Sequence, residues 1–272
     1  MTPSVKIAFV GGGTMAEAIV RGILRDGLYA PERIAIGEPL PARRKALAAE
    51  LGIQSYATAR EAVEGADVVV LAVKPQVLPM VIAELAGQLP ASALLISIVA
   101  GATLNTLAEL GVGSLVRVMP NTPAQIGEGI SVWVASEEVS QAQCQTTSAI
   151  VGALGQAIQV HDEKYIDMTT AVSGSGPGYV FLFIEALTDA AVQIGFARPV
   201  AKQLALQTVK GAAAYAQTRS DDHLAALRNG VTSPGGTTAA GIHELESGGL
   251  RATVTNAVLA AYRKARDLGD CK

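Results

Sequence analysis

The fold of this 272-residue chain is decided by the stretch Val5-Lys6-Ile7-Ala8-Phe9-Val10-Gly11-Gly12-Gly13-Thr14-Met15-Ala16. The residues before the glycines are apolar enough for a buried strand, and the residues after them carry apolar side chains at helical spacing as far as Gly27. Glycines between a strand and a helix allow a tight turn and a close approach to the backbone. The stretch therefore predicts a strand, a glycine turn and a helix in direct succession.

The glycine turn fits the pattern G-x-G-x-x-A, which is typical of dinucleotide-binding domains. In that pattern Gly11 makes the turn and Gly13 admits the pyrophosphate. The second predicted strand, residues 33–37, ends at Glu38, close to where the pattern asks for a carboxylate that binds the ribose hydroxyls. We therefore expect a cofactor site that includes Gly11, Gly13, Thr14, Met15 and Glu38.

The choice of cofactor stays open at this point. Glu38 favours NAD, because a carboxylate repels the 2′-phosphate of NADP. Arg43 and Arg44 follow closely and favour NADP, because an arginine pair can clamp a phosphate. Alternatively, both arginines lie on the solvated face of a helix over residues 41–51. We therefore expect NADPH or NADH, and no metal ion.

Strand and helix patterns continue to alternate as far as residue 160, which predicts a doubly wound α/β domain with an all-parallel sheet. Thr58 starts a capping box, and Ser136 is the expected N-cap of a helix over residues 136–154. Because parallel strands end at one edge, residues just after three strands should share a crevice there. Ordinary strand-ending turns are the alternative. These further cofactor candidates are Ala72, Val73, Lys74, Pro75, Ala100, Gly101 and Asn121.

No strand pattern appears after residue 161, so we expect a Rossmann-type domain over residues 1–161 and an all-α domain over residues 162–272. Within the second half, Tyr179–Leu187 is apolar nearly all round, and such a helix needs burial on every side. About 110 residues of helix cannot easily bury it alone, so we expect a homodimer. Burial inside a large monomeric core is the alternative.

Composition excludes several classes of protein. The net charge of -3 and the low aromatic content argue against a nucleic-acid-binding surface. Cys144 and Cys271 have no paired spacing, and the three histidines share no metal-ligand spacing, so we expect free thiols and no metal site. With neither a secretory leader nor an apolar run long enough to span a membrane, the sequence predicts a soluble, cytoplasmic protein.

A second glycine-rich stretch, Val231-Thr232-Ser233-Pro234-Gly235-Gly236-Thr237-Thr238, comes directly before a predicted helix. It carries four hydroxyls, and a helix N-terminus offers free N–H groups that suit a carboxylate or phosphate. Taken alone, it is more simply a capped turn with Ser233 or Thr237 as the N-cap.

Two sets of motifs resemble those of the pyrroline-5-carboxylate reductase family. In the second half these are Ala171-Val172-Ser173-Gly174-Ser175-Gly176-Pro177-Gly178-Tyr179, the stretch Thr232–Thr238, and Leu245-Glu246-Ser247-Gly248-Gly249-Leu250-Arg251. In the first half they are Ala72-Val73-Lys74-Pro75-Gln76 and Met119-Pro120-Asn121-Thr122-Pro123. The resemblance runs in order from the first strand to the last helix.

The resemblance implies hydride transfer from NADPH or NADH to the C=N carbon of 1-pyrroline-5-carboxylate, which gives proline. It implies an intertwined homodimer, often the unit of a decamer, with the substrate between the nicotinamide and the 231–238 stretch. Ser233 and the N–H groups of Gly236, Thr237 and Thr238 would hold the substrate carboxylate. The Thr238 hydroxyl would reach the ring nitrogen, which makes Thr238 the candidate catalytic residue.

Three departures from the family pattern stand out. The second strand ends in Gly37-Glu38-Pro39, whereas NADP-preferring members tend to show hydroxyl or basic residues there. Thr58-Ala59 replaces an asparagine that is common near the adenosine, and His223-Leu224 replaces a common His-Pro, so we assign His223 no role. A 3-hydroxyacid dehydrogenase is a second candidate, but it needs a lysine on the helix after the linker, and Val172–Ile194 contains none. A non-catalytic dimer is a third, although nothing structural requires four hydroxyls in the 231–238 stretch.

Overall fold

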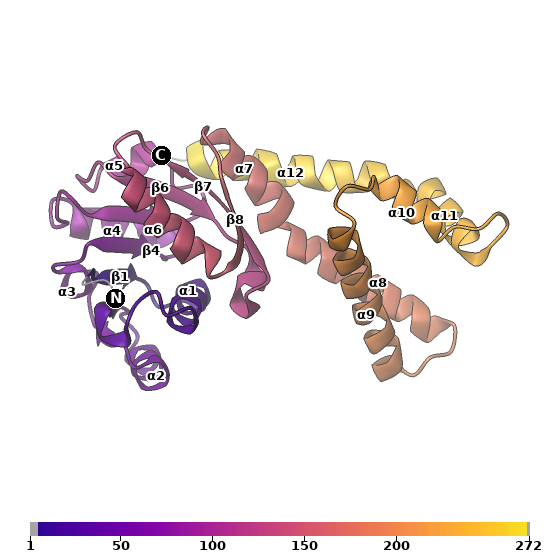
Figure 1. Cartoon of the computed structure of the whole chain (residues 1–272), viewed down its shortest axis with the longest axis horizontal. Helices are drawn as coiled ribbons and strands as arrows, with labels where there is room; N and C mark the ends of the chain where they lie inside the picture. Colours follow the sequence, from indigo (N-terminus) through magenta and orange to yellow (C-terminus); the bar gives the residue numbers. More distant parts are fainter. Residues whose placement is uncertain (1–4, 271–272) are drawn as a thin grey trace. The chain divides into compact units, whose positions relative to one another are not determined.

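A computed structural model describes residues 5–270 of the 272-residue chain, and Cys271 lies outside them. The described residues contain one eight-stranded sheet in the order β3-β2-β1-β4-β5-β6-β7-β8 (Figure 1). Its strands are β1 (Ile7–Val10), β2 (Ile34–Gly37), β3 (Gln54–Tyr56), β4 (Val68–Leu71), β5 (Leu94–Ser97), β6 (Leu115–Met119), β7 (Gly129–Ala135) and β8 (Gly155–Gln159). The order reverses beside β1, as in a doubly wound sheet.

The expectation of an all-parallel sheet is wrong at one position. Strands β1 to β6 pair in parallel, but β7 runs antiparallel to β6, with Trp133 opposite Val118. The connection between β6 and β7 contains only a short 3-10 helix, Thr122–Ile126. A parallel neighbour needs a crossover of a dozen or more residues, whereas a short connection returns the chain in the opposite direction.

Helices cover both faces of the sheet. One face packs against α1 (Thr14–Arg25), α2 (Pro41–Leu51) and α6 (Gln141–Gly152), and the other packs against α3 (Ala59–Val63), α4 (Leu78–Leu85) and α5 (Leu104–Ala108). Side chains of one strand alternate between the two cores, because successive residues of a strand point to opposite faces. Ile7 and Phe9 of β1 join the first core, and Ala8 and Val10 join the second.

Helix starts were predicted with mixed success. Thr58 forms the expected capping box with Glu61 at the start of α3. The expected cap at Ser136 is wrong: α6 begins at Gln141, and Ser140 caps it through a capping box with Gln143. The Ser136 hydroxyl instead donates to the Gly113 carbonyl at 2.8 Å and accepts the N–H of Leu115 at 3.1 Å, so it joins two loop segments.

The chain divides into two compact units. The first comprises Met1–Ser175 and Ala261–Lys272, and the second comprises Gly176–Ala260. The predicted boundary after residue 161 remains a prediction. The helix α7 (Lys164–Thr169), which follows that boundary, packs with the sheet. The described helices of the remaining chain are α8 (Gly176–Gln193), α9 (Arg198–Thr218), α10 (Leu224–Gly230), α11 (Thr237–Ser247) and α12 (Leu250–Asp270).

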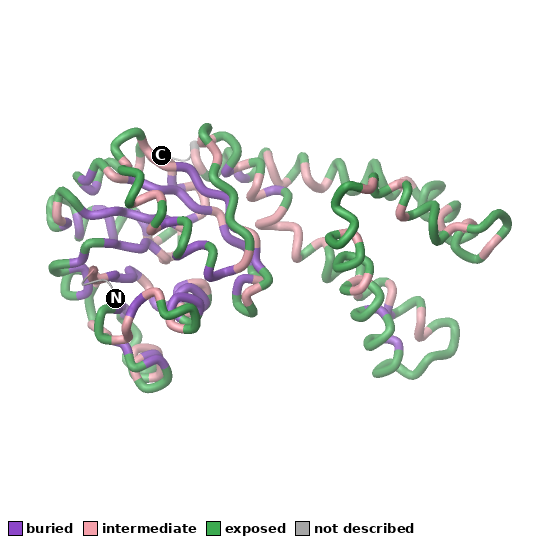
Figure 2. Tube along the Cα trace, viewed as in Figure 1, coloured by how far each residue is buried: buried purple, intermediate pink, exposed green. Residues whose placement is uncertain are grey.

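The second unit leaves much apolar surface uncovered. Helices α8 and α9 pack together through small buried residues such as Ala201 and Ala205. Phe181 and Leu182, in the apolar α8 segment, are 63% and 66% exposed. Figure 2 shows the contrast, with buried strands in the first unit and mostly exposed helices in the second. Apolar surface on this scale is typical of a helix that another chain covers.

The end of α12 belongs to the first unit and packs against the end of β5. Gly101 has a φ of 78°, and a Cβ there would lie 2.8 Å from the Leu268 carbonyl oxygen. Gly269 lies beside the same loop, since a Cβ on it would lie 3.7 Å from the Gly101 carbonyl oxygen. Any larger residue at position 101 would therefore push this last helical segment away from the sheet.

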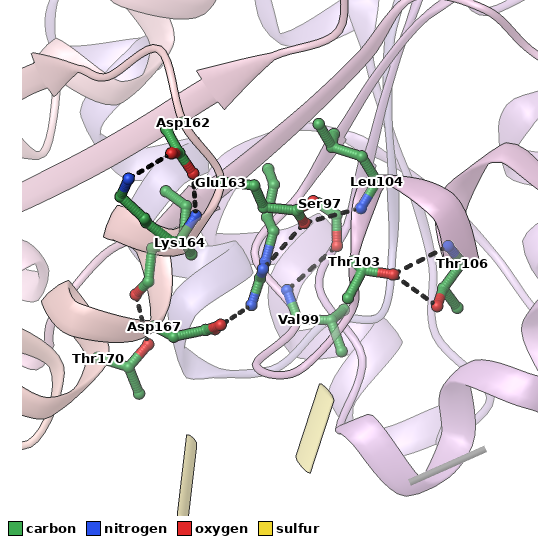
Figure 3. A network of polar contacts seen from close by, with 12 residues as sticks. Ser97, Val99, Thr103, Leu104, Thr106, Asp162, Glu163, Lys164, Asp167 and Thr170 are labelled. Atoms are coloured by element: carbon green, nitrogen blue, oxygen red, sulfur yellow. Dashed lines mark hydrogen bonds and ion pairs between the residues drawn. The ribbon is translucent and has the colours of Figure 1, made fainter. Parts of the chain in front are cut away.

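A buried cation fixes α7 to the sheet. The Arg117 side chain of β6 is 3% exposed and pairs with Glu163 at 2.9 Å and with Asp167 at 2.7 Å. Glu163 also accepts the N–H of Leu104, at 2.8 Å, at the start of α5 (Figure 3). Removing one carboxylate would leave the buried Arg117 charge only partly paired. Its loss should therefore lower the free energy of unfolding more than the loss of a surface ion pair would.

The substitution Asp167→Ala tests the network. We expect it to lower the free energy of unfolding of the first unit by about 3 kcal/mol, since Arg117 loses one of its two carboxylates. Trp133, the one tryptophan of the chain, is buried in β7 and reports this transition by fluorescence in a urea titration. Asp26→Ala, which breaks an exposed ion pair with Arg25, is the control. Equal effects of the two substitutions would contradict the assignment.

Candidate active site

The glycine turn lies between the ends of three strands. Gly11 has a φ of 97° and donates its N–H to the Gly37 carbonyl at the end of β2, at 2.9 Å. A Cβ on Gly11 would lie 2.9 Å from the Ala72 carbonyl oxygen, just after β4. Glycine is therefore required at position 11 both by the left-handed backbone and by the close neighbour.

The start of α1 is open to a ligand. Gly13 is the N-cap of α1 and provides no side-chain cap, and a Cβ on Gly13 would meet nothing within 4 Å. In the described part of the chain, the N–H groups of Thr14 and Met15 make no hydrogen bond. Free N–H groups at a helix N-terminus suit a phosphate. The turn thus has room and donors for a pyrophosphate, so these residues fit a dinucleotide.

Glu38 is fixed against the same turn. It follows β2 directly, is 8% exposed, and accepts the N–H of Gly12 at 3.0 Å and the N–H of Leu40 at 2.9 Å. Gly12 has no space for a side chain, because a Cβ on it would lie 2.8 Å from a Leu47 methyl. The structure therefore brings the predicted ribose carboxylate beside the predicted pyrophosphate turn.

Sequence reasoning missed the contacts that occupy the two arginines. Arg43 donates from Nε to the Gly12 carbonyl at 2.8 Å and pairs with Glu17 at 2.5 Å. Arg44 donates from one terminal nitrogen to the Glu38 and Pro39 carbonyls, at 2.8 and 3.1 Å. Both arginines are partly buried and bonded to neighbouring backbone, and which cofactor they favour remains a prediction. Only the helical spacing of Glu17 after Gly13 could have placed Glu17 near the turn.

The remaining cofactor candidates lie at the ends of β4, β5 and β6. Pro75, Ala100 and Gly101 line one cavity of about 410 Å³ in the first unit, together with Leu268 and Gly269. Ala72 follows β4 and is partly buried, as is Val73, whereas Lys74 is exposed. Their contacts with a cofactor remain predictions.

Asn121 and Gly101 have structural tasks of their own. The Asn121 side-chain oxygen accepts the N–H of Ile130 at 3.0 Å, which fixes the connection between β6 and β7. Asn121 is 9% exposed, so its amide nitrogen has little open surface. Gly101 is needed for the contact with Leu268, whatever else it does.

The 231–238 stretch opens α11, but not through the expected caps. Gly236, and not Ser233 or Thr237, is the N-cap of α11, and it provides no side-chain cap. A Cβ on Gly236 would collide with the Ser233 hydroxyl oxygen, and Gly235 has a φ of 68°. The two glycines therefore let Ser233 lie over the start of the helix.

The donors of this stretch differ from those expected in one respect. The N–H of Gly236 donates to the Ser233 carbonyl at 3.0 Å, so it is already used. Among the described residues, nothing pairs with the N–H groups of Thr237 and Thr238 or with the Thr238 hydroxyl. His223, to which we assigned no role in catalysis, caps α10 by accepting the N–H of Ala225 at 3.1 Å.

Neither a metal centre nor a membrane span is found among residues 5–270. No cluster of three or more His, Cys, Asp or Glu side chains there could hold a metal ion. None of the described helices is long and apolar enough to cross a membrane. Cys144 is a free thiol.

Comparisons with known proteins cover nearly the whole length of this chain. A family model for "Pyrroline-5-carboxylate reductase dimerisation" matches residues 163–268, and one for "NADP oxidoreductase coenzyme F420-dependent" matches residues 6–101. The pyrroline-5-carboxylate reductase of Arabidopsis thaliana is 42% identical over 97% of this chain and 96% of its own. That of Synechocystis sp. is 43% identical over 98% and 99%. The chain belongs to the pyrroline-5-carboxylate reductase family.

Solved structures of family members share the fold of this chain. The Coxiella burnetii pyrroline-5-carboxylate reductase matches with a TM-score of 0.90 at 39% identity, over 98% of this chain and 99% of that one. The Plasmodium falciparum pyrroline carboxylate reductase, solved with NADP bound, matches with a TM-score of 0.89 at 33% identity, over 99% and 100%. The predicted Rossmann-type domain followed by a helical dimerisation domain is confirmed.

Membership in the pyrroline-5-carboxylate reductase family fixes the activity. The chain is an NAD(P)-dependent pyrroline-5-carboxylate reductase of proline biosynthesis. The dimerisation domain supports a homodimer, which accounts for the exposed apolar face of α8. A 3-hydroxyacid dehydrogenase and a non-catalytic dimer are therefore excluded as alternatives.

The open space at Gly13 yields a prediction. Gly13→Ala should leave the free energy of unfolding unchanged, since the added Cβ meets nothing. It should weaken binding of NADH and NADPH at least about tenfold, because the methyl stands in the way of a charge-assisted contact with the pyrophosphate. Titration calorimetry with either cofactor measures this. Gly152→Ala in α6, which also meets nothing, is the matched control. Unchanged affinity in Gly13→Ala would overturn the placement of the pyrophosphate.

Proposed function

We propose that the N-terminus of α11 is the substrate site and that Thr238 is its catalytic residue. The observation that carries this is the unpaired start of α11, where two N–H groups and one hydroxyl lie open beside Ser233. An anion fits such a place because fixed N–H groups and the positive end of the helix dipole both favour it. The substrate of this family carries one carboxylate, which is the anion required.

The roles of the individual residues follow from their donors. The N–H groups of Thr237 and Thr238 and the Ser233 hydroxyl donate to the substrate carboxylate. The N–H of Gly236 already donates within the turn, so Gly236 helps only by leaving space where another residue would have a side chain. The carboxylate is thus held by fixed donors, which orient the ring without reorganisation during the reaction.

The cofactor candidates of the first unit serve the dinucleotide. Thr14 and Met15 offer N–H groups to the pyrophosphate, and Glu38 accepts from the ribose hydroxyls. The residues after β4, β5 and β6 are the remaining candidates: Ala72, Val73, Lys74, Pro75, Ala100, Gly101 and Asn121. The bound cofactor supplies the hydride.

The reaction makes few demands on acid–base groups. A cyclic imine is readily protonated, so the substrate reaches the site as an iminium and needs no strong acid beside it. The Thr238 hydroxyl oxygen accepts the N–H of this iminium and holds the imine carbon in place for the hydride. As the hydride adds to the carbon, the C=N electron pair moves to nitrogen, which keeps its proton. The product is proline, and no step needs a metal ion.

The family resemblance extends the proposal to assembly and compartment. We expect homodimers that associate further into a decamer in the cytoplasm. Size-exclusion chromatography with light scattering distinguishes a dimer from a decamer directly. A monomer at working concentration would contradict both.

Thr238→Ala tests the catalytic assignment. Turnover of pyrroline-5-carboxylate should fall about 10- to 100-fold, as expected for the loss of one hydrogen bond to a charged group. The affinity for NADH and NADPH should stay the same, because the residue faces the substrate and not the cofactor. Absorbance of the reduced cofactor follows the reaction, and titration calorimetry follows the binding.

Two further variants make this test specific. Thr238→Ser keeps the hydroxyl and should restore most of the turnover. Thr218→Ala removes an exposed hydroxyl that only donates to the Tyr215 carbonyl, and it should change nothing. A loss of cofactor affinity in Thr238→Ala would mean that Thr238 belongs to the cofactor site instead.

A further inference from the structure

The glycine turn carries a charge arrangement that bears on which nicotinamide cofactor the enzyme uses. Two anions and two cations lie around it, and all four are engaged in defined contacts. They are Glu17, Glu38, Arg43 and Arg44. The cofactors NADH and NADPH differ only in the 2′-phosphate on the adenosine ribose, which carries a charge between about −1.5 and −2 at pH 7.

Glu38 presents a fixed negative charge where that ribose binds. Each of its two carboxylate oxygens accepts one backbone N–H, from Gly12 and from Leu40, and the residue is 8% exposed. Charge-assisted bonds from both sides hold the carboxylate in one orientation. It cannot swing out to solvent to make room for a second anion. It can still accept hydrogen bonds from the 2′- and 3′-hydroxyls of an unphosphorylated ribose.

Arg43 is held away from a 2′-phosphate. Its Nε donates to the Gly12 carbonyl, and one terminal nitrogen pairs with Glu17. Burial opposes the ionisation of Glu17, but the hydrogen bonds from Arg43 and Arg21 outweigh it, so the pKa of this carboxyl lies below its usual value. Glu17 is therefore charged at neutral pH and neutralises Arg43.

Arg44 is held to the backbone at the end of β2 through one side of its guanidinium. One terminal nitrogen donates to the carbonyls of Glu38 and Pro39. These bonds support the same backbone that presents the Glu38 carboxylate. The Glu38 carboxylate therefore opposes a phosphate, and Arg43, the arginine bonded to the glycine turn itself, is already paired with Glu17.

We infer that this enzyme selects NADH over NADPH, with Glu38 excluding the 2′-phosphate and Glu17 holding Arg43 away from it. Glu38 acts directly on the cofactor, and Glu17 is a positioning residue that acts through Arg43. This goes beyond the NAD(P) dependence of the family and depends only on contacts within the first unit.

The test measures binding without substrate. Titration calorimetry of the dimer should give a dissociation constant for NADH at least tenfold below that for NADPH. Glu38→Gln removes the charge at nearly the same size, and it should shift the ratio of the two constants at least tenfold toward NADPH. Glu17→Gln should strengthen NADPH binding severalfold and leave NADH binding unchanged, because Arg43 gains freedom to meet a phosphate.

Two further substitutions separate positioning from bulk charge. Glu50→Gln removes an equally charged neighbour that pairs with Arg21 but not with Arg43, and it should leave the ratio unchanged. Arg43→Ala in the Glu17→Gln background should abolish the gain for NADPH. Trp133 fluorescence checks that each variant is folded.

Opposite results would overturn the inference. It is wrong if the wild-type enzyme binds NADPH as tightly as NADH, or if Glu17→Gln and Glu50→Gln shift the ratio equally. Turnover of pyrroline-5-carboxylate is a separate measurement. An enzyme that binds NADH tightly but oxidises neither cofactor would contradict the proposed substrate site and leave the cofactor inference intact.

Discussion

The close approach of the Gly11–Gly13 turn to the ends of β2 and β4 is the constraint on which the rest of the first unit depends. A side chain at Gly11 would meet the Ala72 carbonyl, and one at Gly12 would meet Leu47 and Glu38. Because the N-cap Gly13 has no side chain, the first N–H groups of α1 are not capped, and the close packing of the turn lets the carboxylate after β2 reach its backbone. The open start of α1 and the fixed carboxylate of Glu38 thus lie at the same turn, where the proposed cofactor site combines them.

The sequence predicted the order of strands and helices well, because apolar runs and helical spacing are local signals. It failed where a tertiary contact decides. No local sequence signal shows that β7 runs antiparallel to β6, since the direction of a strand follows from the length of the connection before it. Ser136 looked like a helix cap, but its hydroxyl is used between two loops and Ser140 caps α6 instead. The local signal that separates the two serines is the residue three positions on, which is Gln143 after Ser140 and Val139 after Ser136, because only a Glu or Gln there completes a capping box.

The candidate site was predictable to a similar depth. The motifs pointed to the glycine turn and the start of α11, because the backbone there favours glycine, and to Glu38 because it follows the second strand. The ligand roles of these residues remain predictions. The motifs did not reveal that Arg43 is paired with Glu17, which lies 26 residues away in sequence. Nor did they reveal that the Gly236 N–H closes a turn within its own stretch. Such pairings depend on which elements meet in space, and a motif in one segment carries no record of its partner in another.

The contact between Gly101 and Leu268 has a consequence for the order in which the protein forms. The part of the first unit beside β5 is made by residues far apart in sequence, Gly101 and Leu268, and Gly176–Ala260 lies between them. A ribosome therefore releases the helical unit before the nucleotide-binding unit can be completed. Until then, the loop after β5 lacks its neighbour, although all eight described strands of the sheet have already been made. The end of the last helix therefore completes the first unit, and the first unit cannot be fully assembled until synthesis of the chain has finished.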